Sequence, residues 1–177
     1  MNVHMSGSVD VSRPHLIGHS TFEGCSSLTK FTLPFGMTTL CHGAFEGCTS
    51  LTDVALPLAL TDIGDVAFRG CTSLSKLNLP APLTAIGCGA FEGCSSLKEL
   101  TLPYDNTFTT IGADAFRGCT SLSHHTLPTA RLTIIGDGTF PGSTLSFQDG
   151  QAAPAARTGT SLWRQLRAEQ GLACSIS

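Results

Sequence analysis

The sequence predicts a repeat solenoid of the α/β class, made of about six thin rungs of 23 residues each. Two observations predict this fold. A Phe followed by x-Gly-Cys recurs along the chain at spacings of 23, 23, 23, 25 and 24 residues, and the sixth copy is weakened. Such a unit is too short to hold a strand, a full crossover helix and a second strand. The recurring residues are Phe22, Phe45, Phe68, Phe91, Phe116 and Phe140.

The first stretch of each unit has the form Leu-x-x-Leu-x-Leu-Pro, as in Leu74, Leu77, Leu79 and Pro80. Its last residues alternate between apolar and polar, which is typical of a half-buried strand. The Pro ends the strand because it has no N–H to donate to a neighbouring strand. We therefore expect one short parallel strand from this stretch in every rung.

The second stretch reads Leu-Thr-x-Ile-Gly and covers residues 60–64, 83–87 and 132–136. A short Ala-Phe segment follows it, and we expect this segment to form one turn of helix that Gly-Cys closes. A single unit cannot bury its own Leu, Ile and Phe side chains, whereas stacked units bury them in continuous columns. The core is therefore expected to consist of a Phe column and an Ile column.

Polar residues also recur in columns. Two charged columns mostly alternate in sign from rung to rung, which stacking favours because like charges placed opposite each other repel. They are Lys30, Asp53, Lys76, Glu99 and His124, and Glu23, Glu46, Arg69, Glu92 and Arg117. A third column is expected to pair its hydroxyl groups along one face, and consists of Thr38, Thr61, Thr84, Thr109 and Thr133.

These units resemble BspA-type leucine-rich repeats, whose pattern is Leu-Thr-x-Ile-Gly-x-x-Ala-Phe-x-Gly-Cys-x-Ser-Leu-x-x-Leu-x-Leu-Pro. The resemblance covers roughly residues 16–143. It implies a right-handed leucine-rich-repeat solenoid of short parallel strands with short turns or helices on the outside. It also implies a protein-interaction or surface-recognition module in which none of the repeat positions is catalytic.

The composition argues against several other classes of protein. Charged residues make up 13% and hydrophobic residues 41% of the 177 residues, which excludes a disordered chain. The net charge of -3 argues against a nucleic-acid binder. The sequence contains no run of 18 apolar residues, so we expect no transmembrane helix. Residues 1–12 do not resemble a signal peptide. Because the common catalytic and phosphate-binding motifs are also missing, we expect no enzymatic activity and no cofactor.

Five of the eight cysteines occupy one position of the repeat, beside the Phe column, and are interpreted as small buried hydrophobic residues. They are Cys25, Cys48, Cys71, Cys94 and Cys119, while Cys41, Cys88 and Cys174 lie elsewhere in the pattern. A regular column of cysteines without an obvious pairing favours a reducing, intracellular compartment.

A metal site is the alternative use of a further column, which begins with His19, His42 and Asp65. These residue types bind zinc, and stacking brings them onto successive rungs. The same position precedes the Ala-Phe segment, however, where Asp commonly caps a helix start. We therefore expect no metal at this position, and keep metal binding as an alternative.

The chain divides into a solenoid with degenerate terminal rungs over residues 1–143 and a C-terminal extension over residues 144–177. The extension is expected to hold a linker and an amphipathic helix over residues 160–171. Residues 1–150 carry 7 basic and 12 acidic groups, or -5, whereas residues 151–177 carry three Arg and one Glu, or +2. The helix is expected to cap the open end of the solenoid, with insertion in a groove of another protein and binding to a membrane surface as the alternatives. Its binding residues in the second case are Leu162, Trp163, Arg164, Leu166 and Arg167.

The function expected from the sequence is the binding of a protein partner through the outward residues of the first strands, without nucleic acid. These residues are Lys30, Thr32, Asp53, Ala55, Lys76, Asn78, Glu99, Thr101, His124 and Thr126. The alternative is a structural subunit of a larger protein assembly, anchored by its ends and by its C-terminal helix.

Overall fold

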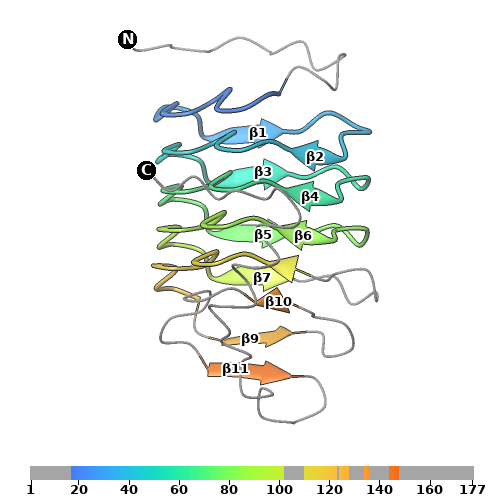
Figure 1. Cartoon of the computed structure of the whole chain (residues 1–177). Coiled ribbons are helices and arrows are strands. Elements are labelled where there is room, and N and C mark those ends of the chain that lie inside the picture. The colour runs from blue at the N-terminus through green and yellow to red at the C-terminus, as the bar shows by residue number, and fades with distance from the viewer. Residues whose placement is uncertain (1–16, 102–109, 123, 128–133, 136–143, 148–177) are drawn as a thin grey trace.

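Figure 1 shows the computed structural model of the chain, which describes residues 17–101 and 110–122 and the strands at residues 124–127, 134–135 and 144–147. Two series of short strands alternate along this part of the chain. The first series is β1 (Lys30–Thr32), β3 (Asp53–Ala55), β5 (Lys76–Asn78), β7 (Glu99–Thr101), β9 (His124–Leu127) and β11 (Thr144–Phe147). The second series is β2 (Thr39–Leu40), β4 (Asp62–Ile63), β6 (Ala85–Ile86), β8 (Thr110–Ile111) and β10 (Ile134–Ile135).

Every strand pair is parallel, and the register follows the sequence repeat. The second series forms one five-stranded sheet in the order β10-β8-β6-β4-β2. In the first series β1 pairs with β3, β5 with β7, and β11 with β9. Lys30 lies opposite Asp53, and Ile63 lies opposite Ile86. Residues that are one repeat apart in the sequence are therefore neighbours on adjacent rungs. The predicted solenoid of thin, stacked rungs is therefore confirmed. Strand β11 continues the stacking past residue 143, where the sequence predicts the solenoid to end.

The outer Ala-Phe segments are stacked turns rather than the turn of helix that the sequence predicts. Phe45 N–H donates to the carbonyl of Ala67 at 2.8 Å, and Gly47 N–H donates to that of Arg69 at 2.7 Å. Alternate N–H groups thus point along the solenoid to the next rung. Gly47 has φ of 71°, a conformation that ends a helix. The expectation of a helical turn is wrong because these bonds between rungs alternate with bonds inside the turn, such as Glu46 N–H to the carbonyl of Gly43 at 3.0 Å, so no continuous helical bonding forms.

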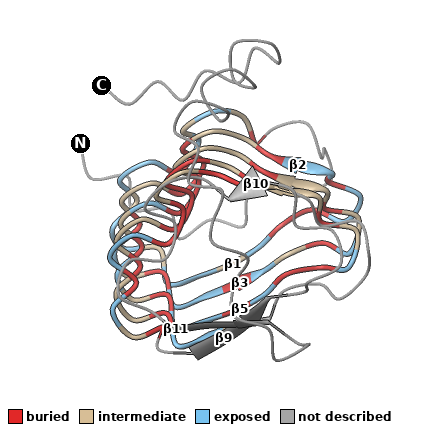
Figure 2. Ribbon diagram, turned by 60° about the horizontal axis from the view of Figure 1, so that its bottom comes forward, coloured by how far each residue is buried: buried red, intermediate tan, exposed pale blue. Residues whose placement is uncertain are grey.

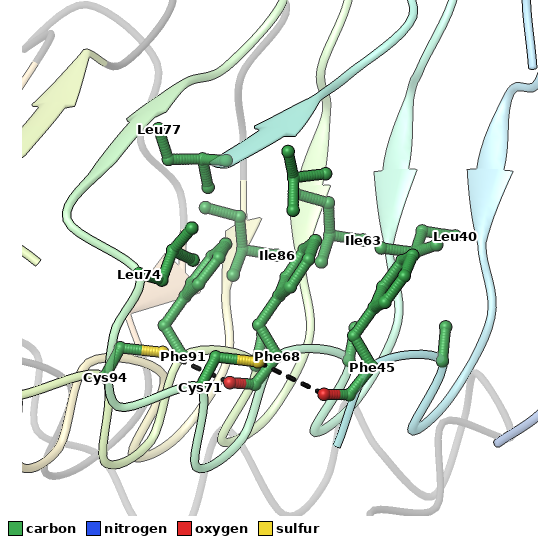
Figure 3. Close-up of a cluster of buried hydrophobic side chains, with 14 of the residues drawn as sticks. Leu40, Phe45, Ile63, Phe68, Cys71, Leu74, Leu77, Ile86, Phe91 and Cys94 are labelled. Atoms are coloured by element: carbon green, nitrogen blue, oxygen red, sulfur yellow. Dashed lines mark hydrogen bonds between the residues drawn. The ribbon is translucent and has the colours of Figure 1, made fainter. Parts of the chain in front are cut away.

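The core lies between the two series of strands and the outer turns (Figures 2 and 3). Successive rings of the Phe column stack nearly parallel: the centroids of Phe45 and Phe68 are 5.4 Å apart at an interplanar angle of 3°, and those of Phe68 and Phe91 are 5.3 Å apart at 6°. Ile63 and Ile86 from the second series face the rings. All of these side chains are buried, so the predicted Phe and Ile columns are confirmed.

Candidate functional site

The strands β1, β3, β5 and β7 together present the surface that the sequence singles out, here called the strand face. In β3 and β5 the central residues Val54 and Leu77 are buried while their neighbours are exposed. This alternation follows from the pleat, which sends successive side chains to opposite sides. The exposed residues of the strand face are Lys30, Thr32, Asp53, Ala55, Lys76, Asn78 and Glu99. Thr101, His124 and Thr126 belong to strands β7 and β9, but their side chains lie outside the described part of the chain.

The charges of the strand face alternate in sign from rung to rung, and two of them form an ion pair. Lys76 Nζ lies 2.9 Å from Glu99 Oε2, and Lys30 is in register with Asp53. The side chains of Lys76 and Glu99 are 59% and 67% exposed, so this ion pair contributes little to stability. The strand face therefore combines small side chains with exposed charges of alternating sign.

A second charged ladder runs over the outer turns, on a different side of the solenoid. Arg69 lies between Glu46 at 3.6 Å and Glu92 at 3.3 Å. Arg117 approaches Glu92 at 3.9 Å. The alternation of charge that the sequence predicts for this column is confirmed over these four rungs. We call this row of four residues the outer ladder.

In the described part of the Thr column, the hydroxyl groups bond to backbone carbonyls of the preceding rung. The hydroxyl of Thr61 donates to the carbonyl oxygen of Thr38 at 3.0 Å, and the hydroxyl of Thr84 donates to that of Thr61 at 3.1 Å. Thr61 also lies 2.6 Å from a carboxylate oxygen of Asp62. Backbone carbonyls are the better-placed acceptors because they point along the solenoid at every rung. The expectation of hydroxyl pairs is therefore wrong for Thr38, Thr61 and Thr84, while Thr109 and Thr133 lie outside the described residues.

Four members of the cysteine column are buried as predicted, whereas Cys25 is half-buried. The buried thiols have acceptors that the sequence did not indicate. The thiol of Cys71 donates to the carbonyl oxygen of Phe45 at 3.1 Å, and that of Cys94 to Phe68 at 3.1 Å (Figure 3). Cys48 and Cys119 make the same contact with the preceding rung. Each thiol therefore binds one backbone group of the neighbouring unit.

Burial also fixes the protonation of these thiols. Loss of hydration raises the pKa of Cys48 and of Cys71 from 9.0 to about 12. It raises the pKa of Cys119 to the same value, and that of Cys94 well above 9.0. A raised pKa favours the protonated form in the folded chain. The resulting stabilisation is fully present below about pH 9 and is lost as the pH rises through about 12. These thiols are not activated nucleophiles, because nucleophilic attack requires the thiolate.

The column considered for a metal contains two histidines, His19 and His42, and the carboxylate of Asp65, which accepts a backbone hydrogen bond. The ring centroids of His19 and His42 are 6.2 Å apart. Asp65, on the next rung, accepts the N–H of Cys88 at 2.7 Å. Among the described residues, no group of three His, Cys, Asp or Glu side chains is placed to hold a metal ion. The role of Asp65 is therefore to join two rungs through a backbone hydrogen bond.

No helix in the described residues has the length and apolar character needed to cross a membrane. The predicted C-terminal helix, with Leu162, Trp163, Arg164, Leu166 and Arg167, lies outside the described residues.

Thin rungs, parallel strands and stacked Phe turns are features of leucine-rich repeats. The sequence profile of the BspA type leucine rich repeat region matches residues 15–146 in six copies. The chain belongs to this family. No curated protein matches the sequence.

Solved structures of other leucine-rich-repeat proteins have a similar fold. The chain is 35% identical to a leucine-rich-repeat protein of T. pallidum, with a TM-score of 0.67 over 74% of this chain and 60% of that one. It is 32% identical to a leucine-rich-repeat protein of Bacteroides ovatus, with a TM-score of 0.62 over 72% of this chain and 32% of that one. A pneumococcal vaccine antigen, PcpA, shares the fold at 24% identity and a TM-score of 0.58, over 74% of this chain and 33% of that one. The chain thus spans between about a third and three-fifths of these larger proteins.

Proposed function

We propose that this leucine-rich-repeat chain is a protein-interaction module without catalytic activity, and that it binds its partner through the strand face. The observation that carries the proposal is the in-register set of exposed residues on β1, β3, β5 and β7. Membership of a family of repeat proteins supports it, because stacked repeats create extended surfaces that bind other proteins.

The strand face suits a protein partner better than the outer turns do. It is built from three-residue strands whose side chains stand perpendicular to the sheet, so a partner meets a continuous surface. Thr32, Ala55 and Asn78 follow one another along this surface at successive rungs. Such small polar and apolar side chains lose little conformational entropy when they are covered. Contact with these rows requires no charged group to lose its neutralising partner.

The described residues offer little for catalysis. Burial raises the pKa of the thiols, such as Cys71, and so keeps them protonated. The carboxylate of Asp65 accepts a hydrogen bond from the backbone N–H of Cys88. A module that acts by surface contact needs neither a nucleophile nor an acid–base pair.

An exchange of charges tests the proposal without changing net charge. Lys76→Glu together with Glu99→Lys keeps an ion pair at the same place but reverses its direction toward a partner. The matched control is Arg69→Glu with Glu92→Arg, which makes the same exchange on the outer ladder. Affinity capture from the native source is compared for the wild-type chain and both variants, each first shown to unfold cooperatively.

A protein that is retained by the wild type and the control, but lost by the strand-face variant, supports the proposal. Equal retention by all three chains, or loss by the control alone, contradicts it and places the contact elsewhere. A chain ending at residue 150 distinguishes the alternative, because a structural subunit anchored by its tail loses its partner on truncation while the strand face is intact.

A further inference from the structure

Two large apolar side chains are exposed to solvent at the turns that follow β1 and β3. Phe35 is 89% exposed and Leu58 is 76% exposed, and they are the large hydrophobic side chains of the described residues that remain uncovered. Both follow the Pro that ends a strand of the first series, so they occupy the same position in two adjacent rungs. The pair is here called the apolar ridge.

The chain holds this ridge outward rather than letting it fold into the core. Met37 N–H donates to the carbonyl of Pro34 at 3.2 Å, and Leu60 N–H donates to that of Pro57 at 3.1 Å. Each turn is closed by this bond, and all four of these flanking residues are buried. Phe35 and Leu58 lie between these buried residues, at the outer tips of the closed turns, and the backbone therefore holds their side chains outward. Contiguous exposed apolar side chains mark interaction sites more often than scattered ones do, and these two lie at the same position of adjacent rungs.

The surroundings of the ridge favour an occupant with basic groups. The rung of Leu58 carries Asp53 on β3 and Asp62 on β4, and no Lys or Arg is present between residues 51 and 63. The rung of Phe35 carries one cation, Lys30, in register with Asp53. Asp53 is exposed, and no Lys or Arg nitrogen of the described residues lies within 4.0 Å of its carboxylate. An occupant that combines apolar side chains with arginines matches this ridge in both hydrophobicity and charge.

We propose that the apolar ridge is the docking site of this chain's own segment Leu-Trp-Arg-Gln-Leu-Arg, residues 162–167. This segment offers Leu162, Trp163 and Leu166 to the ridge and Arg164 and Arg167 to the acidic rung. Docking there goes beyond the proposed function, because it assigns an intramolecular contact to the turns after β1 and β3, although Asp53 also belongs to the strand face.

The length of the chain permits this contact within one molecule. Strand β11 ends at Phe147, five rungs from β1, which corresponds to about 24 Å at the usual spacing of strands. The 15 residues from Phe147 to Leu162 can span about 50 Å when extended. A tethered segment of this kind reaches an effective concentration that is roughly millimolar, so a weak contact is sufficient.

The single Trp of the chain provides a direct test. In the full-length protein, we expect Trp163 to have blue-shifted fluorescence and to be shielded from acrylamide. In the variant Phe35→Ser with Leu58→Ser, the emission should shift to the red, and acrylamide quenching should approach that of a free peptide of residues 158–170. The conservative variant Phe35→Leu with Leu58→Met should behave as the wild type. Because both side chains are largely exposed, the serine variant should still melt cooperatively, and Leu58→Ser alone serves as a milder second variant.

Two results would overturn the proposal: a Trp163 that is already accessible in the wild type, and one that stays shielded in both serine variants. Shielding that rises with protein concentration would also overturn it, because a second copy would then supply the occupant. Loss of shielding in the serine variants only, at every concentration, supports it. These outcomes do not depend on a partner, so the inference and the proposed function can fail separately.

Discussion

Replacement of Phe68 by Ala should be among the most destabilising single changes in this protein. The ring is fully buried and stacks on Phe45 and Phe91, with centroids 5.4 and 5.3 Å away. Phe→Ala changes in cores cost about 3–5 kcal/mol, and the cost is highest where the surroundings cannot close around the cavity. Here the rungs are held apart by backbone hydrogen bonds, such as that from Phe68 N–H to the carbonyl of Ala90 at 2.8 Å. We therefore expect a loss at the upper end of this range, against a total stability of roughly 5–15 kcal/mol.

Urea unfolding followed by circular dichroism measures this loss. The exposed Lys30→Ala provides the control, for which a change within about 0.5 kcal/mol is expected. Phe68→Leu should lie between the two, because it keeps apolar volume but removes both ring contacts, each of which contributes about 0.5–1.5 kcal/mol. A cost below about 1 kcal/mol for Phe68→Ala would refute the reasoning, since it would mean that the rungs can collapse onto the missing ring.

Three further outcomes are expected. At about pH 8 the native chain should protect Cys48 from iodoacetamide, because burial raises the pKa of its thiol to about 12, while half-buried Cys25 reacts; peptide mass spectrometry compares the two. Arg69→Gln should lower the free energy of unfolding by about 0.5 kcal/mol at low salt and by less in about 1 M NaCl, because it removes the centre of the outer ladder; an effect independent of salt in denaturant titrations would contradict this. Gly87→Ala should lower the free energy of unfolding by about 3 kcal/mol or more, because an added Cβ would lie 2.5 Å from the backbone nitrogen of Asp65. Gly70→Ala, with φ of 71° and the nearest atom at 3.8 Å, should lower it by about 1 kcal/mol. Similar melting temperatures for the two variants would contradict this and show that the rungs separate easily.

Much of the fold could be predicted because one period governs the whole chain. Once rungs stack in register, residues one repeat apart become neighbours, as Lys76 and Glu99 do. The same argument placed Phe68 between two other rings and kept Asn78 exposed. These are statements about which positions lie side by side, and a regular sequence carries that information directly.

The contacts that the sequence did not predict depend on where atoms lie within a rung. The thiol of Cys71 meets the carbonyl of Phe45, which is 26 residues earlier rather than one repeat earlier. The hydroxyl of Thr61 finds a carbonyl rather than another hydroxyl. Both outcomes depend on the direction of the backbone carbonyls, and residue spacing contains no information on that direction.

The strand face was predicted as an exposed surface, whereas the apolar ridge was not. Alternation within a strand indicates which side chains point outward, and this holds for Lys30 and Asp53. Phe35 gives no such signal, because an apolar residue in a turn can equally pack inward. Its exposure follows from the closed turn around it, which is a property of the folded backbone.

Carboxyl footprinting on the complex with the captured partner tests the central claim most directly. Carbodiimide labelling of the free chain is compared with labelling of the complex. If the strand face is the binding surface, Asp53 and Glu99 lose label on binding, whereas Glu46 and Glu92 of the outer ladder keep theirs. Protection confined to Glu46 and Glu92, with Asp53 and Glu99 unchanged, would contradict the account and move the interface to the outer turns.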